Sequence, residues 1–150
     1  MDGKNDNTGT HSVYTEIYGY EIMFHVSTLL PYMESDPQKL ERKRHLGNDV
    51  VVVIFKEGDL LFRPDCLRSE FNHVFIIVQK VGVDEDGHTL YKLELSCKET
   101  MAEPWQPFLP DPPIFRKDST LRDWLLTKSE LSNPSSEKRA NELIVLWCSD

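Results

Sequence analysis

The stretch VVVVIF (Val50–Phe55) holds six consecutive apolar residues, and all but the last are β-branched. A run of this kind is typical of a strand buried on both faces of a sheet. The same character returns in VFIIV (Val74–Val78). We therefore predict that these two segments are central strands, and we work outward from them.

Two further segments have the alternating pattern of half-buried strands. In Glu21–Val26, apolar residues at every second position define one buried face. Asp84–Gly87 has the composition of a hairpin turn, and it leads into a strand over His88–Cys97 with one polar face, so we place that strand toward an edge. The order β, α, β, β, β, α predicts an α/β (mixed α+β) fold, with a central mixed sheet flanked by helices.

A helix start precedes the first central strand. In SDPQ (Ser35–Gln38), either Asp36 caps the helix with Pro37 in its first turn, or Ser35 and Gln38 form a capping box. If the helix continued to residue 48, four polar residues would share one face at spacing i, i+3, i+4, i+7. These four residues are Glu41, Arg44, His45 and Asn48. Alternatively, Gly47 ends the helix as a left-handed cap and places Asn48 on the following turn.

The C-terminal third is less regular. Residues 99–117 contain five prolines, too many for a regular element, so we predict a long ordered loop pinned by its aromatic residues against its own domain. A Pro-x-x-Pro ligand for an SH3-type groove is the alternative. A final helix begins at Asp118 or Ser119. The apolar run LIVLWC (Leu143–Cys148) either packs as a helix or stays exposed, which would leave self-association open.

Composition excludes several classes of protein. The formal net charge of −8 disfavours nucleic acid and anionic membranes as partners, because like charges repel. No apolar run reaches the roughly 18 residues that a membrane helix needs, and Met1 to Thr10 is too polar for a signal peptide. Three widely spaced cysteines fit a reducing compartment. We expect a cytoplasmic protein without an integral membrane segment.

The sequence lacks the P-loop, the dinucleotide-binding glycine fingerprint, the Gly-x-Ser-x-Gly elbow and a metal-binding His-x-x-x-His pair. Its histidines are scattered, and a single histidine is more often structural than a metal ligand. We therefore expect no metal site and no cofactor of the protein's own.

Three segments resemble the Rap/Ran-GAP domain family, the GTPase-activating proteins that include the Rap GTPase-activating proteins and tuberin. These segments are EIMFHVSTLLPY (Glu21–Tyr32), KRHLGND (Lys43–Asp49) and FNHVFIIV (Phe71–Val78). The resemblance runs in order over most of the chain, and KRHLGND is highly specific. It implies a domain at residues 13–128, after a flexible lead at 1–12 and before a divergent tail at 129–150. The family extends further at both ends, which suggests a truncated domain.

The resemblance also implies a mechanism. The partner would be a small GTPase of the Ras family, and the first segment is closest to Rap-directed members. An asparagine thumb, matched by Asn48, would enter the nucleotide site of the GTPase, with His45 and Arg44 helping to bind the partner and place the thumb. Further partner contacts are predicted for Glu41, Lys43, Gly47 and Asp49. GTP and Mg²⁺ would arrive with the partner, so the chain would be an activator and not itself a GTP-binding hydrolase.

Two alternatives remain open at this stage. Within the same class, Arg44 could itself be the group that stabilises the charge of the transition state, as an arginine finger does. In a different class, the chain would be a non-catalytic interaction or scaffold module derived from a truncated GAP domain.

Overall fold

The computed structural model describes residues 9–31, 34, 49–59, 61–63, 69–98, 109–131 and 141–148. Within these ranges the chain forms a seven-stranded sheet and one helix. In chain order the elements are β1 (Val13–Ile17), β2 (Tyr20–Val26), β3 (Val51–Lys56), β4 (Val74–Val83), β5 (Thr89–Cys97), β6 (Ile114–Arg116), α2 (Ser119–Leu131) and β7 (Asn141–Cys148).

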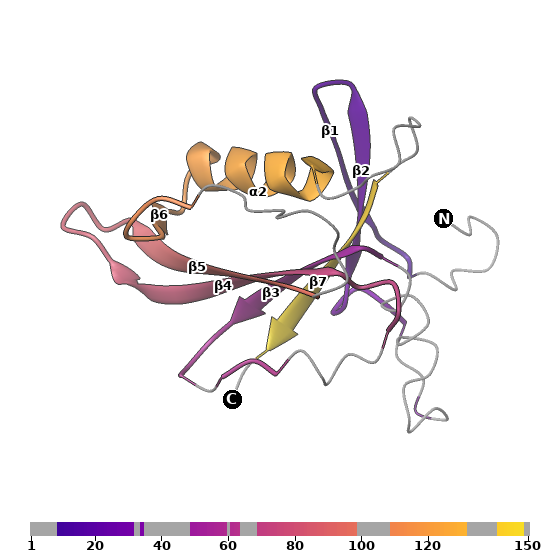
Figure 1. Ribbon diagram of the computed structural model, residues 1–150, viewed down its shortest axis with the longest axis horizontal. Coiled ribbons are helices and arrows are strands. Elements are labelled where there is room, and N and C mark those ends of the chain that lie inside the picture. The colour runs from indigo at the N-terminus through magenta and orange to yellow at the C-terminus, as the bar shows by residue number, and fades with distance from the viewer. Residues whose placement is uncertain are drawn as a thin grey trace.

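The sheet is mixed, as the sequence predicted. Its strand order is β1-β2-β7-β3-β4-β5-β6 (Figure 1). The four inner strands β2, β7, β3 and β4 run parallel, whereas β1, β5 and β6 are antiparallel to their neighbours. The prediction that Val50–Phe55 and Val74–Val78 are central strands is confirmed, because β3 and β4 are both inside the sheet and their first four residues are mostly buried. The strand after the predicted hairpin turn, β5, is second from the β6 edge.

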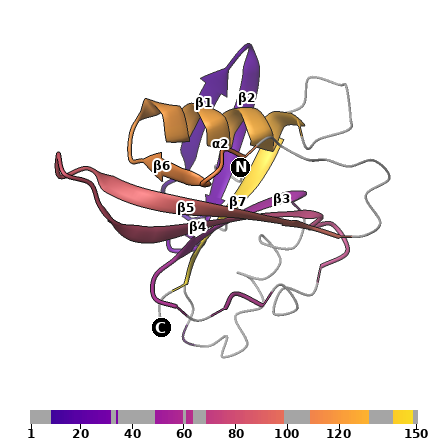
Figure 2. The same ribbon diagram turned by 60° about the vertical axis from the view of Figure 1, so that its left-hand side comes forward.

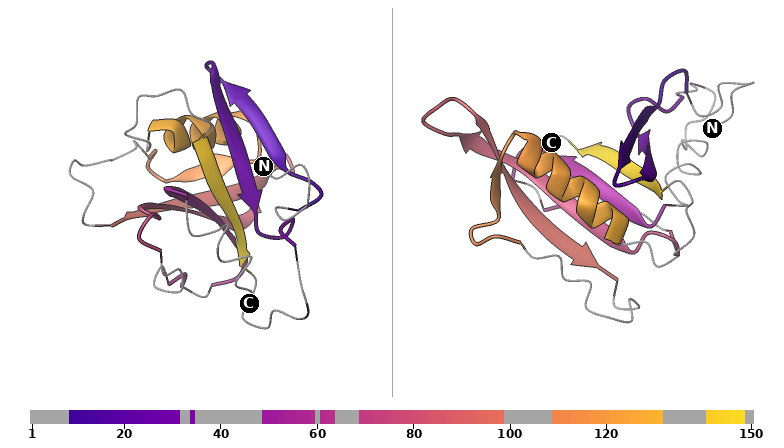
Figure 3. Two further views of the ribbon diagram at one scale, coloured as in Figure 1. Left: turned by 90° about the vertical axis from the view of Figure 1, so that its right-hand side faces the viewer. Right: turned by 90° about the horizontal axis from the view of Figure 1, so that it is seen from above.

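Helix α2 packs across one face of the sheet (Figures 2 and 3). Asp118 caps its N-terminus, because the Asp118 carboxylate accepts hydrogen bonds from the backbone N–H groups of Thr120 and Leu121, at 2.8 and 3.3 Å. Leu121 and Leu126 are buried against the sheet. The buried residues of this core are Ile22, Val51, Val53, Val74, Ile76, Val78, Leu93, Leu121 and Leu126.

The opposite face of the sheet has a smaller core. Val52, Ile54 and Phe75 are buried there, and Phe62 packs on Phe75 with ring centroids 6.4 Å apart. Both faces of the central strands are therefore covered, which is why their sequences are continuously apolar instead of alternating.

The C-terminal apolar run corrects one of our predictions. We expected a helix or an exposed segment, but residues Asn141–Cys148 form β7, a parallel strand between β2 and β3 (Figure 1). Val145 is in register with Val26 on one side and with Val53 on the other. A short apolar run is compatible with a buried strand or a buried helix, and local periodicity cannot distinguish the two.

Two short strands were also missed. The first missed strand is β1, which is joined to β2 by a turn at Tyr18 and Gly19. Both turn residues have positive φ, 52° and 81°. This geometry is that of a two-residue hairpin of the primed type, in which glycine is favoured. In the proline-rich segment we predicted no regular element, yet Ile114–Arg116 forms β6 against β5. β6 can pair because it lies after the last proline of that segment and forms the edge of the sheet.

Several predictions concern residues outside the described ranges. They are the helix from Ser35 or Asp36 to Asn48, most of the N-terminal lead and the loop at 99–108. Among the described residues, no helix has the length and hydropathy that crossing a bilayer would require.

Candidate functional site

The three segments that carry the family resemblance meet at one place in the fold, just before β3. Asp49 is the residue that immediately follows the predicted thumb, and it lies between a histidine of β2 and an asparagine that precedes β4. Its carboxylate Oδ2 is 2.8 Å from Nδ1 of His25. Its carbonyl oxygen accepts a hydrogen bond of 2.6 Å from Nδ2 of Asn72. We refer to His25, Asp49 and Asn72 as the Asp49 cluster.

The register of the parallel strands β3 and β4 explains why Asn72 lies beside Asp49. Val51 of β3 is paired with Val74 of β4, so the residues before the two strands meet at the same end of the sheet. The backbone N–H groups of His73 and Val74 both donate to the carbonyl of Val50, at 2.9 and 3.1 Å. This pairing brings Asn72 beside Asp49.

His25 reaches Asp49 from a strand that does not pair with β3. Its strand, β2, is separated from β3 by β7 in the sheet order. The contact therefore spans the position of β7, and it joins residues 24 positions apart in the sequence. Because a carboxylate can only accept hydrogen bonds, Nδ1 of His25 must carry the hydrogen in this contact.

Two of the three residues of the Asp49 cluster are buried, and the third is partly buried. Asp49 is 2% exposed and Asn72 is fully buried, while the side chain of His25 retains 18% of its exposure. A buried carboxylate is costly unless it is hydrogen-bonded, so the His25 contact is needed to keep Asp49 in this position. The second carboxylate oxygen, Oδ1, has no hydrogen-bond partner within the described part of the chain.

Of the predicted site residues, only Asp49 lies within the described ranges. Glu41, Lys43, Arg44, His45, Gly47 and Asn48 lie outside them. We predicted that Asp49 binds the partner, but in the structure its carboxylate is engaged inside the chain. To touch a partner directly, this side chain would have to leave its buried position.

Sequence reasoning did not select His25 or Asn72 as site residues. Both stood in the segments that carried the resemblance, EIMFHV and FNHV, but as single polar residues beside apolar runs. The available signal was that each introduces hydrogen-bonding capacity next to a buried strand, where it must find a partner.

A second polar group lies at the turn between β4 and β5. Asp84, Asp86 and His88 place one possible ligand atom each within 4.8 Å of one another. However, Arg116 already contacts both carboxylates, with Nε 2.7 Å from Asp84 and Nη2 3.1 Å from Asp86. A cation would have to displace this guanidinium, so the group is better described as an ion-paired turn that connects the hairpin to β6.

This turn predicts a pH dependence of stability. Partial burial acts to raise the pKa of Asp84, but backbone N–H donation from His88, the charges of Arg116 and His88, and a second N–H from Asp86 hold the pKa below its ordinary value of 3.8. Because the folded pKa is the lower one, the stabilisation is present above pH 3.8 and is lost as the pH falls through the folded pKa. Asp84→Asn should lower the melting temperature at pH 7, and the difference from wild type should shrink below pH 3.8. Thermal unfolding at several pH values measures this, and a constant difference would contradict it.

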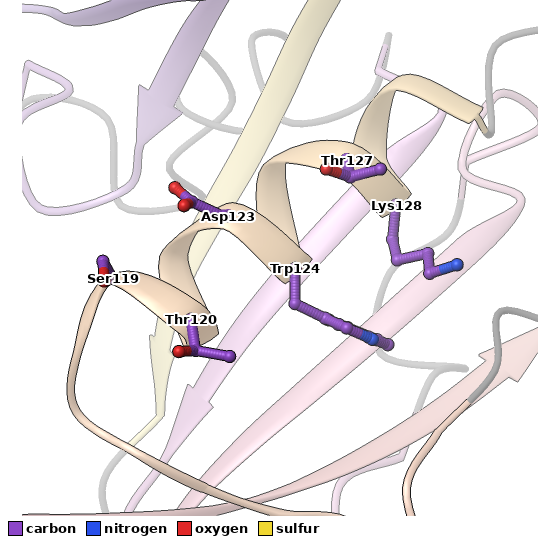
Figure 4. A pocket seen from close by; sticks show the side chains of 6 residues that line it. All are labelled: Ser119, Thr120, Asp123, Trp124, Thr127 and Lys128. Atoms are coloured by element: carbon purple, nitrogen blue, oxygen red, sulfur yellow. The ribbon is translucent and has the colours of Figure 1, made fainter.

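A shallow groove of about 500 Å³ lies along α2 (Figure 4). Trp124 and Lys128 extend from the same side of the helix, and Trp124 also packs on Phe115 with ring centroids 5.6 Å apart. The remaining lining residues are Ser119, Thr120, Asp123 and Thr127. The lining mixes hydroxyls with one acid and one base, and no residue of the Asp49 cluster is part of it.

Known proteins resemble this chain in sequence. The family model described as Rap/ran-GAP matches residues 1–144. A human GTPase-activating Rap/Ran-GAP domain-like protein 3 is 44% identical over 131 residues, which is 85% of this chain and 12% of that protein. Human signal-induced proliferation-associated 1-like protein 3 is 49% identical over 129 residues, which is 85% of this chain and 7% of that protein. A PH and Rap-GAP domain-containing protein of Dictyostelium discoideum is 45% identical over 128 residues, 85% of this chain and 10% of that protein.

The fold has a solved counterpart as well. The structure of the TSC2 GAP domain matches with a TM-score of 0.67 and 28% sequence identity, and it covers 85% of this chain and 68% of that one. The chain thus spans about a tenth of the length of the curated relatives and about two thirds of this solved domain. From the family model, the three relatives and the shared fold together, we conclude that this chain belongs to the Rap/ran-GAP family.

Proposed function

We propose that this chain is a GTPase-activating module for a small GTPase of the Ras family, with a Rap-like protein as the favoured partner. Membership of the family supports the general activity. The relative from Dictyostelium, whose name includes a Rap-GAP domain, supports the choice of Rap. The chain would act in the cytoplasm, and GTP and Mg²⁺ would be carried by the GTPase.

The observation that carries the proposal is the convergence of three distant segments on the residue next to Asn48. His25, Asp49 and Asn72 each come from one of the segments that resemble the family. Their contacts are made inside the protein, which is what a supporting framework for an adjacent working residue requires. Asn48 itself is the residue we propose to enter the nucleotide site.

The chemistry of Asn48 suits this role. Its carboxamide has one acceptor oxygen and two donor hydrogens, so it can accept from the attacking water and donate toward the γ-phosphate. An amide is not a general base at neutral pH. The proposed contribution is therefore positioning and electrostatic stabilisation, which are the main contributions to phosphoryl transfer in general.

The neighbouring residues have supporting roles in the proposal. Arg44 and His45 would bind the GTPase and orient the thumb, and Glu41 and Lys43 would add contacts around them. Gly47 has no side chain, so it would allow the two backbones to approach closely.

The proposal is tested by single-turnover GTP hydrolysis. GTP-loaded Rap, other Ras-family GTPases and Ran are each mixed with increasing amounts of the purified chain. We expect saturable acceleration with Rap and less with the others. Association without acceleration for every GTPase would instead establish the alternative, a non-catalytic interaction or scaffold module. Neither association nor acceleration with any GTPase would refute both.

A further inference from the structure

We propose that His25 and Asn72 are positioning residues for Asn48, which they hold in place through Asp49. The inference rests on the proposed function of Asn48, but the contacts that carry it are independent of any partner. Asp49 is held at two separate groups, its carboxylate by His25 and its carbonyl by Asn72. A residue held at both its side chain and its backbone has little freedom to rotate or shift.

The next residue along the chain is held as well. The carbonyl of Val50 accepts from the N–H groups of His73 and Val74, at 2.9 and 3.1 Å. The two residues after Asn48 are therefore connected to the start of β4, and β4 belongs to the main core of the sheet. The C-terminal side of the proposed thumb is thus attached to the most buried part of the fold.

Asn48 is directly bonded to Asp49, so a restraint on Asp49 also limits the movement of Asn48. Consecutive Cα atoms are about 3.8 Å apart across a planar trans peptide, and only two soft dihedral angles per residue separate them. Rotation of Asp49 would therefore displace Asn48 directly. A working side chain must be held within about 0.5 Å of its productive position, and a displacement of about 1 Å can reduce a rate about 100-fold.

Burial makes the arrangement sensitive to His25 in particular. Asp49 is 2% exposed, and its Oδ1 atom already lacks a hydrogen-bond partner among the described residues. Without the imidazole, Oδ2 would lose its hydrogen bond too, and a buried carboxylate in that state would move toward water. The backbone at Asn48 would move with it.

Two substitutions at His25 separate positioning from packing. His25→Asn retains an N–H donor near the place of Nδ1, whereas His25→Leu retains volume but has no donor. Met23→Ala is the matched control, because Met23 is on the same face of β2 but is neither charged nor a hydrogen-bond donor. Asn72→Leu is the corresponding variant on the other side of Asp49.

The expected result is a selective loss of turnover. His25→Leu should lower kcat for GAP-stimulated hydrolysis about 10- to 100-fold, with KM for the GTPase changed less than about threefold, because the thumb is displaced while the binding surface remains. His25→Asn should recover most of the loss, and Met23→Ala should leave kcat near wild type. Equal kcat values for His25→Leu and Met23→Ala would overturn the inference, as would a failure of His25→Asn to recover activity.

Hydrogen–deuterium exchange provides a readout that does not need activity. In the chain alone, the amides of residues 44–50 should exchange faster in His25→Leu and Asn72→Leu than in wild type, while those of β4 stay protected. If one of these two variants unfolds globally, the amides of β4 also lose protection from exchange. The test then relies on the other variant of the pair. Unchanged exchange at 44–50 in folded variants would refute the positioning role. If instead the wild type activates no GTPase, the proposed function fails, while exchange still reports whether the cluster restrains these residues.

Discussion

Asn48→Ala is expected to remove nearly all acceleration of GTP hydrolysis while leaving association with the GTPase largely intact. GAPs accelerate hydrolysis by Ras-like proteins by up to about 10⁵-fold, which is roughly 7 kcal/mol of barrier. If positioning by Asn48 supplies even half of that, its loss lowers the rate by more than about 100-fold. Alanine removes the carboxamide but retains the Cβ, so Asp49 should keep its own contacts with His25 and Asn72.

Single-turnover hydrolysis and a separate binding measurement check this result together. Near-wild-type hydrolysis by Asn48→Ala would show that the thumb is not the catalytic group. Arg44→Ala is the informative comparison, because an arginine finger would make it as damaging as Asn48→Ala, whereas the thumb mechanism predicts a milder loss that is partly in binding. The two mechanisms therefore predict different rankings of the same two variants.

Val145→Pro is expected to be strongly destabilising, because it places a proline in an inner strand of the sheet. Val145 lies in the middle of β7, in register with Val26 and Val53, and its carbonyl accepts from the N–H of Ser27 at 2.8 Å. Proline has no N–H to donate to the neighbouring strand, and prolines are rare in central strands for this reason. Leaving one buried ladder acceptor unsatisfied costs about 1 to 3 kcal/mol, before any distortion of the strand.

The consequence extends beyond β7. In the sheet order, β7 is the connection between the β1–β2 hairpin and β3. Weakening it separates the strand that carries His25 from the one that follows Asp49, so both stability and the Asp49 cluster should suffer. Typical domains have only about 5 to 15 kcal/mol of net stability, so a loss of this size removes a substantial fraction of the total.

Urea unfolding measures this loss. Val13→Pro is the matched control, since Val13 is the first residue of the edge strand β1, a position where proline is tolerated. Equal unfolding free energies for the two proline variants would mean that β7 does not hold the sheet together.

Local sequence patterns predicted the elements whose signals lie within a few residues. The two apolar runs became β3 and β4, the Asp84–Gly87 segment became the hairpin turn, and Asp118 caps α2. These features follow from side-chain branching, turn chemistry and capping, which do not depend on distant parts of the chain. The same patterns did not identify β7, because an apolar run carries no information about which strands will be its neighbours.

The candidate site divides in the same way. The KRHLGND segment and its Asn48 were recognisable from the sequence, because the order of residue types is itself the signal. The role of Asp49 was not recognisable, because it depends on His25 and Asn72, which are 24 and 23 positions away. A carboxylate next to a basic segment suggests a surface contact until its burial is known.

The sequence by itself thus determined the family, the central strands and the residue proposed to do the chemistry. Only the tertiary structure decided that the C-terminal run completes the sheet between β2 and β3, and that Asp49 is a buried internal contact beside Asn48. The reason is physical. Strand formation and capping arise from neighbours in sequence, whereas strand order and the cost of burying a charge depend on groups brought together only when the chain has folded.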